Sequence, residues 1–249
     1  MTVANQRAVK AAAQPASPGL APVTPRPHRK RLRHDERRRT IIEATLVCLA
    51  RDGAEGTSLR SVCRELGVAP SLVTHFFANW RDLLDAAYRD LCGRFTAMLR
   101  EALDRDYPSA RTRMDAVIAV YLSTDWAGET SIGASIAFWQ LSRSIPDLRR
   151  SFGVFLIDRG RLLRQALLAL VAEAGAHVDI DKLADGLMLM LDGIWLEISL
   201  NPGSIDEERT RRLCWYWLDL ALARSDWPPA RGVIERPGDE SGAGVASVD

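Results

Sequence analysis

Apolar residues recur every three or four positions along most of the chain, and alternation with a period of two is almost absent. A period near 3.6 residues is that of an α-helix with one buried face, whereas a half-buried strand alternates residue by residue. The chain has 249 residues, 47% of them hydrophobic and 26% charged, which is enough to bury a sizeable core. We therefore predict an all-α protein.

The second and third predicted helices are short and are separated by a tight turn. The first helix, which precedes them, ends near Gly53. The second begins after Thr57 or Ser58, because either residue is a good N-cap. Gly67 follows where the chain must turn sharply, and Pro70 suits the first turn of the next helix, where its missing N–H would be unpaired in any case. These proportions predict a helix-turn-helix.

The helix that begins at Pro70 is the one that such a motif places in the major groove of DNA. Val73 and Phe77 are four residues apart on one face, and we expect them to hold the helix against its neighbours. The other face carries groups that can contact phosphates, bases or a thymine methyl: Pro70, Ser71, Thr74 and His75. For His75 two interpretations stay open, because its imidazole can contact DNA or make a structural hydrogen bond.

Positive charge is concentrated at the N-terminal end. Residues 1–39 contain ten Lys or Arg against two acids, a surplus of eight in a chain whose net charge is +1. A polyanion favours clustered cations through counterion release, so we expect Arg37 and Arg38 to contact DNA. We predict that residues 1–33 form a disordered basic arm, with or without a DNA contact of its own, and that residues 226–249 form a disordered tail. The helix-turn-helix domain then spans residues 34–80.

Residues 81–225 are expected to form a larger helical domain. Its last two helices, at 181–200 and 205–223, are apolar on more than one side, so each needs a second partner. We predict that this pair forms a four-helix dimer interface, with a monomeric core as the alternative. Three arginines of the preceding helix are expected to lie largely away from its apolar side: Arg149, Arg159 and Arg161.

Aromatic residues in this second domain suggest a ligand site. The candidate contacts are Tyr121, Trp126, Trp139, Asp192 and Trp195. Aromatic faces attract cations, and quaternary ammonium groups are often held in aromatic cages. Asp192 lies three residues before Trp195, on the same side of a helix, and can balance the positive charge. The alternative is an ordinary aromatic core.

Other classes of protein are not supported by motifs. The sequence contains no GxSxG, HExxH, P-loop or Rossmann fingerprint, so we predict that the protein is not an enzyme and needs no cofactor. The four cysteines, at positions 48, 63, 92 and 214, lack CxxC spacing and favour reduced core thiols over a metal site. No long uninterrupted apolar stretch or signal peptide is present, so we expect a cytoplasmic protein with no membrane contact. A purely protein-binding helical module is a remaining alternative, although it would not account for the helix-turn-helix.

The chain contains "GAEGTS", a second predicted helix that ends in Gly-Val, and an aromatic pair followed, after five residues, by "LL". With these features, residues 37–88 resemble the DNA-binding domain of the TetR family of transcriptional regulators. The segments "IAFWQLSRSIPDLRR" and "LDGIWLEISLNPGSIDEERTRRLCWYWLDLAL" are similar to the BetI branch, whose members are repressors that respond to choline. Thr74 and Trp80 depart from the family pattern, since many members have tyrosine and lysine there as phosphate contacts.

The resemblance implies a homodimer that binds a palindromic operator in double-stranded DNA and is released by a small-molecule effector, such as choline or a related quaternary amine. A regulator of an efflux or catabolic operon that responds to a hydrophobic compound is the alternative. The full set of candidate DNA contacts is Arg37, Arg38, Thr57, Ser58, Pro70, Ser71, Thr74 and His75.

Overall fold

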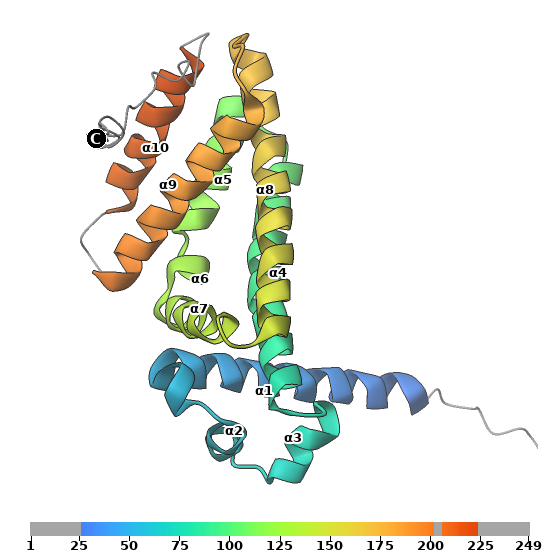
Figure 1. Cartoon of the computed structure of the whole chain (residues 1–249). Helices are drawn as coiled ribbons and strands as arrows, with labels where there is room; N and C mark the ends of the chain where they lie inside the picture. The colour runs from blue at the N-terminus through green and yellow to red at the C-terminus, as the bar shows by residue number, and fades with distance from the viewer. Residues whose placement is uncertain (1–25, 202–205, 224–249) are drawn as a thin grey trace, which may run out of the picture. The chain divides into compact units, whose positions relative to one another are not determined.

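The computed structural model describes residues 26–201 and 206–223, with side chains from residue 33 onward. Within these residues the chain forms ten α-helices and no strand, as predicted (Figure 1). The helices are α1 (Arg26–Gly56), α2 (Leu59–Leu66), α3 (Pro70–Phe76), α4 (Trp80–Asp104), α5 (Ala110–Leu122), α6 (Thr124–Ala127), α7 (Glu129–Ser142), α8 (Pro146–Ala174), α9 (Ile180–Leu200) and α10 (Glu207–Leu222).

The chain divides into two compact units, residues 1–37 and 38–249. In the first unit α1 begins at Arg26, so residues 26–33 are helical, whereas the sequence predicts a disordered arm there. Pro27 is in the first turn of the helix, where proline is tolerated, and nothing after it breaks the helix before Gly53. The rest of the predicted arm, residues 1–25, and the predicted tail, 226–249, lie outside the described residues.

In the second unit, α1 continues and kinks at Gly53, whose φ of 68° and ψ of −174° are not helical. Glycine adopts a positive φ without the steric cost that a β-carbon imposes. The apolar side of α1 is buried against the following helices, with Ile41, Cys48 and Leu49 fully inaccessible to solvent. The sequence predicts that this helix ends near Gly53. In the structure α1 is interrupted at Gly53 and ends about one turn later, at Gly56.

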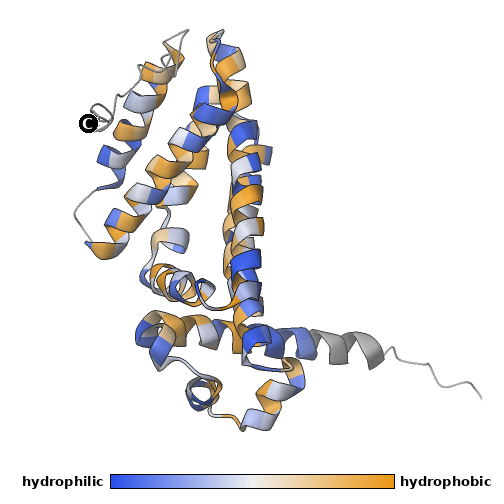
Figure 2. Cartoon of the chain, in the orientation of Figure 1, coloured by the Kyte–Doolittle hydropathy of each residue, from blue (hydrophilic) through white to orange (hydrophobic). Residues whose placement is uncertain are grey.

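The larger helical part is organised around α4 and α8, which run side by side (Figure 1). Helix α5 packs on both, α9 packs on α8, and α10 packs on α5 and α9. The core between these helices is aromatic and aliphatic, with Phe95, Tyr121 and Phe138 almost completely buried. Figure 2 shows apolar residues along both α9 and α10. On each helix some apolar side chains are buried and others are exposed, in agreement with the two-sided pattern that the sequence indicates.

Arg111 fixes α10 against α5. Its guanidinium makes two hydrogen bonds to Asp219, at 2.6 and 3.0 Å, and lies 4.0 Å from the ring centroid of Trp215. The Trp215 indole in turn donates to Asp115 at 2.8 Å. None of the helices in the described ranges is long and apolar enough to cross a membrane.

Candidate DNA interface and effector cavity

The turn between α2 and α3 is set by local capping. Ser58 is the N-cap of α2 and accepts a hydrogen bond from the Ser61 N–H, while the Ser61 hydroxyl accepts one from the Ser58 N–H. Gly67 closes the helix in the left-handed conformation at φ 64°, and its N–H donates to carbonyls of the last turn. Pro70 is the first residue of α3. The structure thus has the helix-turn-helix that the sequence predicts, with Ser58 as the cap.

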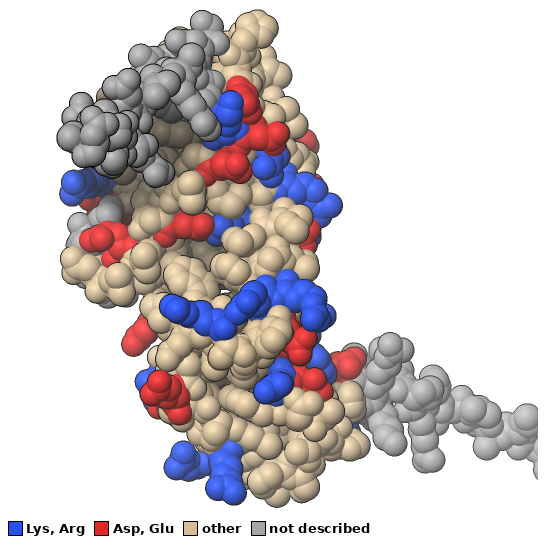
Figure 3. Space-filling model, viewed as in Figure 1, with Lys and Arg blue, Asp and Glu red and all other residues tan. Residues whose placement is uncertain are grey.

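Helix α3 has one buried and one exposed face. Val73 and Phe77 are buried, whereas the side chains of the other face are exposed: Pro70, Ser71, Thr74 and His75. The Thr74 hydroxyl is within hydrogen-bonding distance of the Pro70 and Ser71 carbonyls, and the His75 ring packs edge-on against Phe76 at 5.2 Å. The helix contains no Lys, Arg, Asp or Glu, and Figure 3 shows its surface as largely uncharged beside basic side chains over α2.

Thr57 is the one candidate DNA contact that lies in the core. Its side chain is buried, and its hydroxyl lies 2.6 Å from the Gly53 carbonyl oxygen and 3.1 Å from that of Cys48. The hydroxyl thereby ties the kink in α1 to the start of α2. We assign Thr57 a positioning role and omit it from the proposed DNA surface.

Arg37 and Arg38 are both exposed on α1. The Arg38 guanidinium lies 4.9 Å from the ring centroid of Phe77, at the end of α3, which links α1 to the helix-turn-helix. Two further arginines, Arg60 and Arg64, are exposed on α2. They were not among the sequence candidates, although their spacing of four residues places them on one helix face.

A cavity of about 230 Å³ lies between the helices of the larger part of the chain. It brings together all five ligand-binding candidates: Tyr121, Trp126, Trp139, Asp192 and Trp195. The Trp195 ring is at the centre of the aromatic wall, 5.1 Å from Trp139 and 6.1 Å from Trp126 between centroids. Phe155 also lines the cavity and lies 6.0 Å from Trp126.

Arg159 also lines this cavity, contrary to the prediction from the sequence that it lies largely away from the apolar side of α8. Only 4% of it is exposed, and its guanidinium makes two hydrogen bonds to Asp192, at 2.6 and 2.7 Å. The sequence spacing does indicate that Arg159 is on the buried face of α8, because it is four residues from both Phe155 and Leu163. The charge of Asp192 is therefore already balanced within the protein.

The electrostatics of the cavity follow from burial. Burial alone lowers the pKa of Arg159, but its hydrogen bonds to Asp192 and the nearby acidic groups outweigh this and raise it overall, so the guanidinium stays charged. Burial raises the pKa of the Tyr121 phenol above its ordinary value, and that of the Cys92 thiol to about 12. Tyr121 and Cys92 are consequently neutral at physiological pH.

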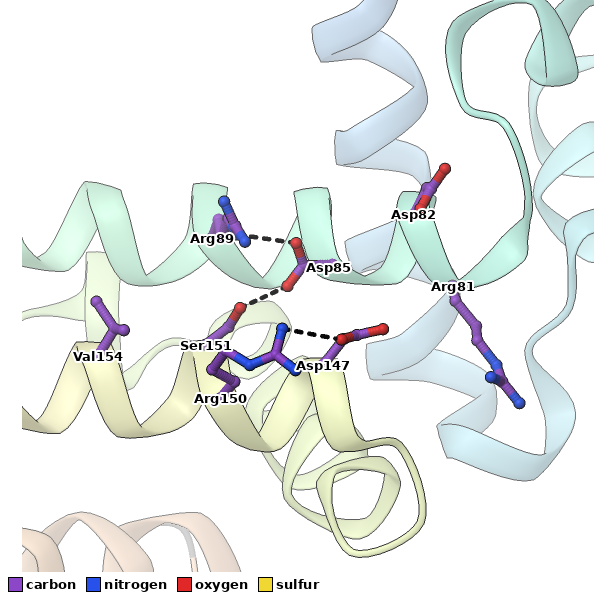
Figure 4. A pocket seen from close by; sticks show the side chains of 8 residues that line it. All are labelled: Arg81, Asp82, Asp85, Arg89, Asp147, Arg150, Ser151 and Val154. Carbon is purple, nitrogen blue, oxygen red and sulfur yellow. Dashed lines mark hydrogen bonds and ion pairs between the residues drawn. The ribbon is translucent and has the colours of Figure 1, made fainter.

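A second cavity, of about 300 Å³, lies near the N-terminal ends of α4 and α8. Figure 4 shows that most of its charged groups are paired with each other: Asp85 with Arg89 and Ser151, and Arg150 with Asp147. Because six of its eight lining residues are charged and none is aromatic, we do not regard it as the effector site.

All four cysteines are buried in the core without a disulfide, as the sequence predicts.

Comparisons with known proteins agree with this architecture. Residues 41–87 match the family of bacterial regulatory proteins named for TetR, and residues 110–223 match the C-terminal domain of BetI-type transcriptional repressors. The HTH-type transcriptional regulator BetI of Burkholderia cenocepacia J2315 is 30% identical over 190 residues, which cover 75% of this chain and 94% of that protein. The chain belongs to the BetI-type branch of the TetR family. As a TetR-family regulator it is not an enzyme.

Solved structures show the same TetR-family fold. A transcriptional regulator from Pseudomonas aeruginosa PAO1 is 33% identical, with a TM-score of 0.71, over 79% of this chain and 95% of that one. A regulator from Saccharomonospora viridis, in complex with choline, is 19% identical with a TM-score of 0.65, over 74% and 96%. FadR from Bacillus subtilis, in complex with stearoyl-CoA, is 18% identical with a TM-score of 0.61, over 74% and 97%.

Proposed function

We propose that this BetI-type regulator is a repressor that binds a palindromic operator as a homodimer and is released by a small effector. The observation that carries the proposal is the combination of an α3 with one exposed polar face and an aromatic-lined cavity in the same chain. In this proposal, α3 lies in the major groove and effector binding favours a conformation with a different spacing of the two α3 helices. Only an effector with different affinities for the two conformations can release the DNA.

The DNA surface of the proposal combines side chains from three helices. Ser71, Thr74 and His75 of α3 are exposed and suited to contact bases and phosphates. Arg37 and Arg38 of α1 supply positive charge for the phosphate backbone, and Ser58, exposed at the start of α2, adds a hydroxyl. Pro70 presents an apolar ring at the N-terminal end of α3.

The homodimer is supported by apolar side chains left exposed on the last two helices. These are Leu189, Leu196 and Leu200 on α9 and Leu213, Tyr216 and Leu220 on α10. They recur at three-, four- and seven-residue intervals, the spacing of a helix face that packs on another helix. Pairing of two copies through α9 and α10 would form a four-helix interface and give the two-fold symmetry that a palindromic operator requires.

For the effector we propose choline or a related quaternary amine. The aromatic wall formed by Trp126, Trp139 and Trp195 suits a methylated ammonium group, and the related Saccharomonospora viridis protein was solved with choline. The cavity, at about 230 Å³, lies below the range of roughly 300–1,000 Å³ that is typical for drug-sized ligands. The size favours a small effector over a long acyl compound, which is the alternative suggested by the stearoyl-CoA complex of FadR.

Fluorescence anisotropy tests the proposal with labelled DNA from the region upstream of the protein's own coding sequence. Tight binding that choline weakens, and that unrelated hydrophobic compounds leave unchanged, is the expected result. Release only by a hydrophobic compound would keep the regulator and reject the quaternary amine. A verified dimer without specific DNA binding would overturn the proposal.

A further inference from the structure

Three buried polar atoms of residues that line the effector cavity have no hydrogen-bond partner among the residues whose side chains are described. They are the phenol oxygen of Tyr121, Nε of Arg159 and the indole Nε1 of Trp195. All three residues line the cavity, and each is more than nine-tenths buried. Buried polar groups in native proteins are nearly always hydrogen-bonded. Ordered water or a bound molecule supplies such partners, and we take three unpaired groups on residues that line one cavity as the mark of a bound molecule.

The hydrogen-bonding chemistry of these atoms indicates which kind of partner they require. Arg Nε and Trp Nε1 can only donate a hydrogen bond, and a neutral tyrosine hydroxyl can donate as well. Each terminal nitrogen of Arg159 donates to Asp192, at 2.6 and 2.7 Å, so Nε is the nitrogen of this guanidinium that has no partner. The residues of the cavity thus offer a surplus of donors, and the complement of such a surplus is an oxygen that accepts several hydrogen bonds.

The charges of Arg159 and Asp192 restrict the class of ligand further. Arg159 and Asp192 present a positive and a negative group side by side and neutralise each other. A simple cation would add an unbalanced positive charge beside the buried guanidinium, and a simple anion would do the same beside the carboxylate. A molecule with both charges can place its ammonium against the aromatic wall and Asp192 while its anionic oxygens accept from the three donors.

Resting on the proposed function, we propose that the effector is a small zwitterion, a trimethylammonium carboxylate, whose carboxylate accepts hydrogen bonds from Tyr121, Arg159 and Trp195. A carboxylate has two oxygens and about four acceptor positions, enough for all three donors. The hydroxyl of choline has a single oxygen and satisfies fewer of them.

Isothermal titration calorimetry with four matched compounds separates this inference from the proposed function. Trimethylglycine carries both the ammonium and the carboxylate, and choline carries the ammonium with a hydroxyl. In 3,3-dimethylbutanoate an uncharged tert-butyl group replaces the trimethylammonium group of trimethylglycine. In 3,3-dimethylbutan-1-ol the same group replaces that of choline. We expect trimethylglycine to bind about tenfold more tightly than choline, because hydrogen bonds to a charged acceptor are stronger than those to a hydroxyl.

The four affinities test the carboxylate inference and the quaternary-amine function separately. If choline binds as tightly as trimethylglycine or more tightly, the carboxylate inference is wrong, but the quaternary-amine function stands. If the two tert-butyl compounds bind as well as their ammonium counterparts, the quaternary-amine function fails, while a preference for 3,3-dimethylbutanoate over the alcohol would still support the carboxylate. Binding of none of the four would overturn both.

Substitution of one donor provides a second readout. Tyr121→Phe removes the hydroxyl and keeps the ring, so it should weaken trimethylglycine several-fold and change choline affinity by less than twofold. Tyr107→Phe makes the same change at a residue outside the cavity and should alter neither affinity. An equal loss for both ligands in Tyr121→Phe would show that the hydroxyl has only a structural role.

Discussion

Gly133 of α7 lies so close to Ala50 of α1 that a β-carbon at position 133 would stand 2.8 Å from both the Cα and the carbonyl oxygen of Ala50. Backbone atoms cannot move aside as a flexible side chain can, so the two helices would have to separate. Helix α7 also carries Ser135 and Trp139, which line the effector cavity. The cavity is thus connected through a single helix to the helix that precedes the helix-turn-helix.

Gly133→Ala should therefore change the coupling between effector and DNA. We expect the ratio of DNA affinities measured without and with a saturating effector to fall by at least threefold, because the altered contact between α7 and α1 no longer distinguishes the two conformations as well. Gly93→Ala is the matched control, since a β-carbon there meets nothing within 4 Å. An unchanged ratio in Gly133→Ala would rule out this contact as a route of coupling.

Trp195→Ala should abolish the response to the effector and leave DNA binding intact. The substitution removes the ring that contacts both Trp126 and Trp139, and it is expected to cost about 3–5 kcal/mol of stability. Leu187→Ala, a fully buried residue of the same helix that does not line the cavity, controls for that loss. Anisotropy titrations below the melting temperatures of both variants make the comparison, and a normal response of Trp195→Ala would reject its role in binding.

Asp192→Asn should destabilise the fold, because it leaves the Arg159 guanidinium buried without its counter-charge. Breaking a fully buried pair costs about 3–5 kcal/mol, and we expect about 2 kcal/mol here, since 40% of the Asp192 side chain is exposed. Urea unfolding measures the difference. Asp158→Asn, on an exposed pair with Arg161 in α8, should change the free energy of unfolding by less than about 1 kcal/mol. Similar losses of unfolding free energy in the two variants would contradict a stabilising role for the pairing of Asp192 with Arg159.

Deletion of residues 1–33 should weaken DNA binding and flatten its dependence on salt. The deletion removes seven Lys or Arg residues, and each phosphate contact contributes a slope of about −0.9 in log affinity against log salt concentration. Residues 226–249 can be deleted as a control, for which we expect no change in slope. An unaltered slope after removal of residues 1–33 would show that this segment does not contact DNA.

Leu189→Arg should shift the protein from dimer to monomer, because this side chain is 73% exposed on α9, within the proposed interface. A charged group buried at an apolar interface without a partner is strongly unfavourable. Ile157→Arg is the control, as Ile157 is 72% exposed but lies on α8. Sedimentation equilibrium distinguishes the two states, and a dimeric Leu189→Arg variant would place the interface elsewhere.

Much of the architecture could be predicted because its signals are local. Ser58, Gly67 and Pro70 each specify a helix start or end through the geometry of a few neighbouring backbone groups. The five cavity candidates could be found because aromatic residues and one acid stand out in apolar helices. They converge on one cavity in the structure, although their contact with an effector is still a prediction.

Features that depend on distant contacts were not predictable in the same way. Thr57 was a reasonable DNA candidate by residue type, and only the folded chain shows its hydroxyl turned to the Gly53 carbonyl. The pairing of Arg159 with Asp192 joins residues 33 positions apart on two helices. Its partner could not be deduced from the spacing within α8, although that spacing does place Arg159 on the buried face.

The absence of charged side chains from α3 separates how tightly the protein holds DNA from which sequence it selects. In the proposed DNA surface, the arginines of α1 would attract any duplex, and dissolved salt weakens such an attraction. Hydroxyl, imidazole and apolar contacts from α3 would depend little on ionic strength, because they release few counterions. Changes in cellular salt should thus alter occupancy at all sites in parallel, while the ranking of one operator over another stays nearly constant.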